Sequence, residues 1–256
     1  MANFLHNFVL GVTTSLPMPP LLAPRPSTTG DPVARRHHHW SVQVLALPAL
    51  AAVLVALPVF VQAPWVRQAP VAALAFTIPL VALALALAAQ ERSRALGEVL
   101  LGFSGSWLGG CLFWGWFRLH PVEHLPLEAI ALPLALAGLN SRWRRAGAFY
   151  LGSLLGTAAT DAAMALTGVM DLWPQVLAAP LSTAPQLLQQ AAATALRPSS
   201  LAVIAAAALL LLRLSQNLWR RGECGRIAAA ALATTLAVDG LFLAAASLAP
   251  HLSGLI

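Results

Sequence analysis

Seven apolar runs, separated by short turns that carry arginine, limit how this 256-residue chain can fold. The runs cover residues 41–63, 70–90, 97–117, 122–139, 146–169, 199–217 and 226–248. Six of them are long enough, at 1.5 Å per helical residue, to cross a hydrocarbon core about 30 Å thick. Because backbone polar groups in lipid must be bonded within the segment, such runs predict helices that span a membrane.

The composition excludes a water-soluble enzyme. Hydrophobic residues make up 59% of the chain and charged residues only 9%, with a mean hydropathy of +0.75. A soluble domain carries about 25% charged residues, and one of this length could not bury so much apolar surface. We therefore expect an all-α, polytopic transmembrane helix bundle over residues 41–250.

The arginines predict how many spans there are and which way they run. All 15 basic residues are arginine, and with seven spans and the N-terminus inside, twelve of them lie on the inner side. If the short run at 122–139 did not cross, only six would lie inside. Cytoplasmic loops are enriched in basic residues. The sequence therefore predicts about seven spans, with the N-terminus inside and the C-terminus outside.

Two segments lie outside the predicted spans. Residues 1–40 are rich in proline and small polar residues, which is typical of a mobile tail, here on the cytoplasmic side. The outer loop at 171–198 contains Gln186, Gln190 and Thr194 at a spacing of four. That spacing favours an interfacial helix on the outer face, and a plain loop is the alternative.

Three carboxyl groups fall inside the apolar runs. Asp161 and Asp239 lie in runs expected to point outward, and Glu128 lies in one expected to point inward, which places all three at a similar depth in the outer half. Threonines share their helix faces at spacings of three or four residues. The candidate polar site is Glu128, Thr157, Thr160, Asp161, Thr235 and Asp239.

Two interpretations of this polar site are open. Ionisable groups inside a membrane usually face a bundle interior or a water-filled cavity, where they relay protons or cations or bind a polar solute. Alternatively, a protonated aspartate can form hydrogen bonds between helices and serve packing alone.

Glycines recur at a spacing of four residues in two of the runs. Gly152 and Gly156 form one such pair, and Gly105 and Gly109 form another that Gly102 extends. Small residues let helix backbones approach closely in lipid, so we expect helix packing here. A cavity wall, or a contact with pigment or lipid, is the alternative.

The histidines predict no metal site. His120-Pro-Val-Glu123-His124 fits the H-x-x-E-H pattern of inverted zinc peptidases, but prolines bound the stretch and favour a solvated turn at the interface. No phosphate-binding loop, dinucleotide motif or nucleophile–base pair is present. We therefore expect no metal and no cofactor. The sequence leans against enzymatic activity without deciding it, and a membrane-embedded acyl or lipid transferase is the third hypothesis.

Four strings in order carry a resemblance: PVFVQAPWVR (58–67), GFSGSWLGGCLFWGWFR (102–118), LPLEAIALPLALAGL (125–139) and FYLGSLLGTAATD (149–161). They resemble an uncharacterised family of cyanobacterial integral membrane proteins, catalogued as a domain of unknown function, over about residues 45–245. The resemblance implies a cyanobacterial source and a plasma or thylakoid membrane. It implies no activity.

Two functions follow as hypotheses. The intramembrane carboxyl groups favour a small permease-like protein for a solute, coupled to protons or cations. The glycine-lined spans favour a non-catalytic assembly or scaffold protein of a thylakoid or plasma membrane complex. The expected partners are the lipid bilayer and, in the second case, other membrane proteins. Nucleic acid is not expected, because the arginines lie in short clusters between apolar runs.

Overall fold

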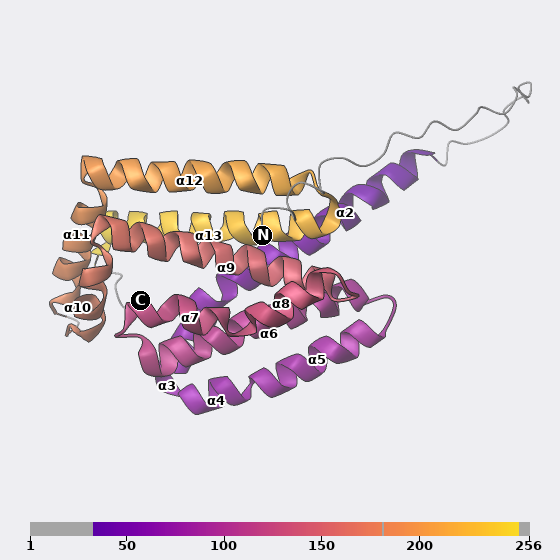
Figure 1. The fold of residues 1–256 in the computed structure, drawn as a ribbon, viewed down its shortest axis with the longest axis horizontal. Helices are drawn as coiled ribbons and strands as arrows, with labels where there is room; N and C mark the ends of the chain where they lie inside the picture. The colour runs from indigo at the N-terminus through magenta and orange to yellow at the C-terminus, as the bar shows by residue number, and fades with distance from the viewer. Residues whose placement is uncertain (1–32, 181, 251–256) are drawn as a thin grey trace, which may run out of the picture. The chain divides into compact units, whose positions relative to one another are not determined.

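A computed structural model describes residues 33–180 and 182–250, with side chains described from residue 45 onward. Within that part every regular element is a helix and none is a strand (Figure 1). The α-helices are α2 (Val33–Leu57), α3 (Ala63–Gln68), α4 (Pro70–Ala75), α5 (Thr77–Ala89), α6 (Arg94–Leu112), α7 (His124–Glu128), α8 (Leu132–Leu139), α9 (Arg144–Thr167), α10 (Trp173–Ala178), α11 (Ala184–Ala195), α12 (Pro198–Trp219) and α13 (Gly222–Leu248).

Short non-α turns join several of these helices. Two are π-helical, η1 (Pro58–Gln62) and η2 (Phe113–Phe117), and they extend α2 and α6. Three are 3-10 helices, η3 (Pro121–Glu123), η4 (Ala129–Ala131) and η5 (Met170–Leu172). Residues 1–32, which make up most of the predicted tail, lie outside the described residues, and α2 begins at Val33, before the predicted boundary at residue 40.

Six helical segments of the described part are long and apolar enough to cross a membrane. They are Leu45–Gln68, Pro70–Ala89, Arg94–Phe117, Pro121–Leu139, Pro198–Trp219 and Gly222–Leu248. The expectation of an all-α chain is therefore confirmed for the described residues, and these six segments have the length and hydropathy expected of membrane spans. The number of crossings and their direction stay predictions.

Helix α9 corresponds to the remaining predicted span, 146–169. It has 24 residues, which is enough to cross a membrane, but polar and small residues lower its hydropathy. It packs against α6, α8, α12 and α13 (Figure 1). A helix surrounded by other helices meets protein rather than lipid, so it tolerates such residues.

Contacts along their lengths show that α6, α9 and α13 run parallel. Glu98 of α6 pairs with Arg145 of α9, and Phe103 further along α6 stacks on Phe149 further along α9. In the same way Gly152 lies against Ala228 of α13, and four residues later Gly156 lies against Thr235. When two successive helices of this set are parallel, the segment between them has to run back along the bundle in the opposite direction.

The glycines of α6 and α9 lie where neighbouring helices approach closely. A Cβ atom on Gly152 would lie 2.6 Å from the carbonyl oxygen of Ala228, and one on Gly156 would lie 2.5 Å from the Thr235 hydroxyl. On α6, Gly102 faces Ala146, Gly105 faces Tyr150 and Ala131, and Gly109 faces the backbone of Leu127 and Glu128. Side chains at these positions would separate the helices.

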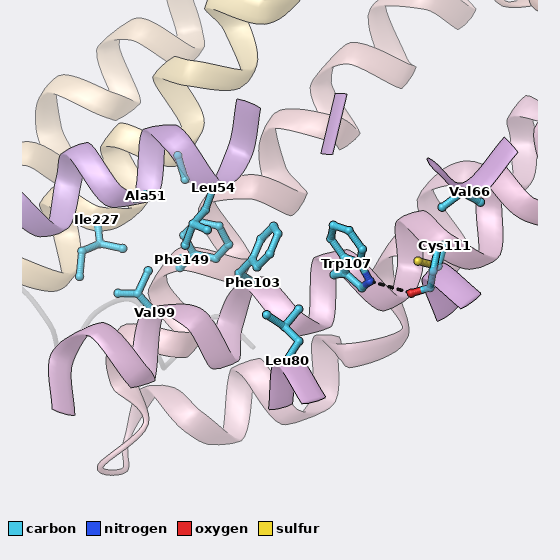
Figure 2. Close-up of a cluster of buried hydrophobic side chains, with 12 residues drawn as sticks. Ala51, Leu54, Val66, Leu80, Val99, Phe103, Trp107, Cys111, Phe149 and Ile227 are labelled. Atoms are coloured by element: carbon cyan, nitrogen blue, oxygen red, sulfur yellow. Dashed lines mark hydrogen bonds between the residues drawn. The ribbon is translucent and has the colours of Figure 1, made fainter. Parts of the chain in front are cut away.

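An aromatic cluster fills the contact between α2, α6 and α9. Phe103, Trp107 and Phe149 are buried there with Leu54 of α2, as Figure 2 shows. The indole N–H of Trp107 donates a hydrogen bond to the carbonyl oxygen of Ala73 at 3.1 Å. Trp107 thus lies inside the packed core with its polar atom paired, as a buried indole requires.

An ion-pair network centred on Arg145 joins three helices at the end of the bundle where α6, α9 and α13 begin. The guanidinium of Arg145 donates to Glu98 at 3.0 Å and also to Glu223. Glu98 is only 2% exposed. Its charge is compensated by the arginine, and burying it unpaired would be costly.

The predicted outer loop at 171–198 is largely helical. Helix α11 covers the stretch for which an interfacial helix was one of two interpretations, and the plain-loop alternative is wrong. Gln186 and Gln190 are exposed and Leu188 is buried, whereas Thr194, expected on the polar face, is buried. In Figure 1, α10 and α11 lie at the end of α9 and α12.

Candidate functional site: a polar cluster in an apolar cavity

A cavity of about 640 Å³ lies among α2, α6, α7 and the helices from α9 to α13. Its wall is mostly alanine, leucine, valine and aromatic side chains. This volume falls in the range of pockets that hold drug-sized molecules, which are typically apolar with a few convergent polar groups. The polar groups of this cavity come mainly from α7, α9 and α13.

His124 joins two of the carboxyl groups. Its Nδ1 lies 3.0 Å from Oδ1 of Asp161 on α9, and its Nε2 lies 3.4 Å from Oε1 of Glu128, one turn further along α7. The three side chains are 14–22% exposed, and all three line the cavity. A protonated imidazole in this position donates toward both acids, and a neutral one toward only one of them.

The histidine ring is also held by an aromatic neighbour. Its centroid lies 4.2 Å from that of Phe113 in the π-helical turn η2, with an angle of 35° between the rings. This corrects the interpretation of His124 as part of a solvated turn. Proline-bounded residues 121–123 do form a turn, but α7 begins at His124 and directs its side chain toward α9. His120 is exposed, as expected for that turn.

Glu128 is supported by two residues of α9. The Thr157 hydroxyl donates to Glu128 Oε2 at 2.9 Å. The Tyr150 hydroxyl donates to the backbone carbonyl of Glu128 and accepts from the Ala131 N–H at 3.1 Å. The helix is irregular here, passing from α7 through η4 to α8, and Tyr150 satisfies backbone groups that this break leaves free.

Asp239 forms a second arm of the cluster, on α13. The Thr160 hydroxyl lies 2.5 Å from Asp239 Oδ2, and the same hydroxyl lies 3.1 Å from the carbonyl oxygen of Gly156. One turn earlier on α13, the Thr235 hydroxyl donates to the carbonyl oxygen of Ala231 at 3.2 Å. Both Thr235 and Asp239 line the cavity.

All six residues of the candidate polar site therefore lie on the wall of one cavity. Glu128, Thr157 and Asp161 belong to the arm that contains His124, and Thr160 and Asp239 form the other arm. Thr160 and Asp161 are adjacent in α9, so this helix connects the arms. Within the described residues, no three histidine, cysteine or acidic side chains are arranged to hold a metal ion.

Gln62 is a wall residue that the sequence analysis did not single out. It is 1% exposed and ends the π-helical turn η1. Its Nε2 lies 2.5 Å from the carbonyl oxygen of Trp107 and 3.1 Å from Cys111 Sγ. The feature of the sequence that could have indicated Gln62 is a single amide side chain within an apolar run, four residues after Pro58. Turns of this π-helical type are frequently found at functional sites, and η2 also lines the cavity, through Phe113 and Trp114.

Two tryptophans of the cavity wall contact each other. The rings of Trp114 and Trp173 are 5.7 Å apart, and the Trp173 indole donates to the carbonyl oxygen of Arg118 at 2.8 Å. Trp173 begins α10, so this contact fastens the segment after α9 to the end of η2.

A family described as a protein of unknown function (DUF3120) matches residues 51–247. The chain belongs to this family. The expectation of an uncharacterised family is thereby confirmed, and the match includes all the polar residues of the cavity. No curated protein and no solved structure matches the chain. The family assigns no activity, so the function has to be argued from the site.

Proposed function

We propose that this protein is a permease-like membrane protein that binds a solute in the cavity among α2, α6, α7 and the helices from α9 to α13 and couples its movement to protons. The observation that carries this proposal is the placement of His124, Glu128, Asp161 and Asp239 on the wall of one cavity. Acidic and histidine side chains inside membrane proteins mark proton relays and solute sites.

A helix-packing role explains this arrangement less well. Side chains that only join helices are expected to be buried against each other, whereas these four face a space large enough for a solute. The break between α7 and α8 beside Glu128 also fits a solute site, because discontinuous helices often form binding sites in transporters.

The proposal includes seven spans, with the N-terminus inside and the C-terminus outside. Parallel α6, α9 and α13 support this count, since each consecutive pair then encloses one returning segment. The inner side receives the arginines near the start of α9 and the end of α12. A plasma or thylakoid membrane of a cyanobacterium is the location that the resemblance implies.

The test is proton flux in liposomes that contain the purified protein and a pH-sensitive dye, after a pH gradient is imposed. The wild type is expected to dissipate the gradient faster than empty liposomes, and Asp161→Asn to slow it to the empty rate. Asp171→Asn is the control, because Asp171 is exposed in η5 and is not on the cavity wall. Wild-type rates in both Asp161→Asn and Asp239→Asn would remove the proposal.

An assembly or scaffold role is the second candidate. The observation that favours it is the apolar surface of α12, where Leu201, Leu209, Leu210 and Leu212 are exposed. Lipid or the helices of another protein would cover this surface. Stoichiometric co-purification with a larger complex in mild detergent would support it, and recovery of the protein alone would count against it.

A further inference from the structure

The cavity wall carries an unbalanced set of charges. Among the residues with described side chains, the ionisable groups on the wall are three carboxyl groups, Glu128, Asp161 and Asp239, and one imidazole, His124, and none is an arginine. A protonated imidazole could balance one carboxylate. The remaining acids need either protons or a cation, because an isolated charge in an apolar environment is costly.

The three acids differ in their partners. Glu128 and Asp161 both face His124, and Glu128 also accepts the hydroxyl of Thr157. For Asp239, the hydrogen bond that the described residues provide is the one from Thr160 to Oδ2. Within the described residues no hydrogen bond to its other carboxylate oxygen is found, and Asp239 lines the cavity. Asp239 is therefore the acid best placed to pair with a ligand.

The rest of the wall fits an apolar molecule. Alanine, leucine and valine side chains from α9, α11, α12 and α13 surround the space, and Phe113, Trp114, Trp173 and Phe242 contribute aromatic rings. Aromatic faces attract cations as well as apolar groups. Several polar groups of the wall, such as those of Gln62, Thr157 and Thr160, are already bonded within the bundle, so most of the surface offered to a solute is apolar.

We propose that the cavity binds a lipophilic organic cation whose positive charge pairs with Asp239 while its apolar body occupies the space between α11, α12 and α13. This inference rests on the proposed function, since it takes the cavity as the solute site. It assigns the arm with His124, Glu128 and Asp161 to protons and the arm with Thr160 and Asp239 to the solute.

The test compares two probes of the same shape and opposite charge, tetraphenylphosphonium and tetraphenylborate. Their binding to the full-length protein in detergent is measured by equilibrium dialysis. The cation is expected to bind saturably and the anion not to bind. Asp239→Asn keeps the shape and the hydrogen bond from Thr160 but removes the charge, so the cation should bind at least about tenfold more weakly.

The control is Asp171→Asn, which should bind the cation as the wild type does, and thermal unfolding checks that Asp239→Asn is folded. Equal binding of the two probes, or unchanged cation binding in Asp239→Asn, would overturn the inference. Binding that depends on Asp239 without any flux in liposomes would uphold it and remove the permease proposal. Proton flux in liposomes without cation binding would overturn this inference and uphold the permease proposal.

Discussion

His124 is the side chain on which the first arm of the polar cluster depends, because each of its ring nitrogens faces a carboxyl group. Without the imidazole, Glu128 and Asp161 would lose the donor between them and face each other across the space that it leaves. Like charges so placed repel, and a buried polar group without its partner costs stability.

We therefore expect His124→Asn to lower the free energy of unfolding by about 1–3 kcal/mol and to abolish proton flux. Thermal unfolding of the purified protein in detergent measures the first effect, and the liposome assay measures the second. His120→Asn, four residues earlier and exposed, should change neither. A His124→Asn protein with the stability and flux of the wild type would show that the imidazole is dispensable.

At this scale the sequence indicated the acids but not their partner. A carboxyl group in an apolar run is conspicuous, and helical spacing places Thr157 and Thr160 beside Asp161. His124 follows a proline-bounded turn, and helical periodicity does not predict where a side chain points after such a turn. Its role depends on how α7 packs against α9 and η2, which is a tertiary feature.

Helix α9 is the element that organises the bundle, through close contacts with its neighbours. On its α13 side, Gly152 and Gly156 leave no room for a side chain. Without a hydrophobic driving force between helices in lipid, such close contacts supply much of the association.

Gly152→Ala should therefore destabilise the protein by about 1–3 kcal/mol, the usual effect of an extra methyl group in a packed contact. Its Cβ would meet backbone atoms of Ala228, which cannot move aside. Gly240→Ala on α13 is the matched control, since nothing lies within 4 Å of a Cβ there. The measurement is the midpoint of thermal unfolding, and equal midpoints for the two variants would contradict this account.

The sequence predicted the boundaries of the helices better than it predicted the irregular turns. Arginine-bearing turns and prolines at first helical turns, such as Pro70 and Pro198, bound the helices close to the predicted limits. The π-helical turns η1 and η2 and the break at η4 were not predicted. The break at η4 is stabilised by Tyr150, whose hydroxyl bonds backbone groups of Glu128 and Ala131, and this partner is distant in sequence.

For the whole molecule, the central prediction is that the two ends of the chain lie on opposite sides of the membrane. A reporter that is active only outside the cytoplasm should be active after Ile256 and inactive after Arg221, in the turn between α12 and α13. A fluorescent reporter that works only in the cytoplasm should give the opposite pattern. Activity of the first reporter at Arg221 would mean that the arginines do not set the orientation.

The cavity could not be predicted from the sequence. Its wall combines residues from α2 to α13, separated by up to about two hundred positions, and most of them are apolar side chains that look like any lipid-facing or core residue. The span order predicts a similar depth in the membrane for the three acids. That they line one cavity, and that His124 joins Glu128 to Asp161, could be known only from the packing of the helices.

The pairing of Arg145 with Glu98 and Glu223 has a consequence for how the bundle can move. It clamps α6, α9 and α13 together at the end where these helices start, while the Thr160–Asp239 contact fastens α9 to α13 further along. The glycine contacts lie between the two attachments. Sliding α9 along α13 would break both attachments at once. The register between these two helices is therefore fixed along α9 from Arg145 to Thr160, and so is the alignment of the side chains that they contribute to the cavity wall.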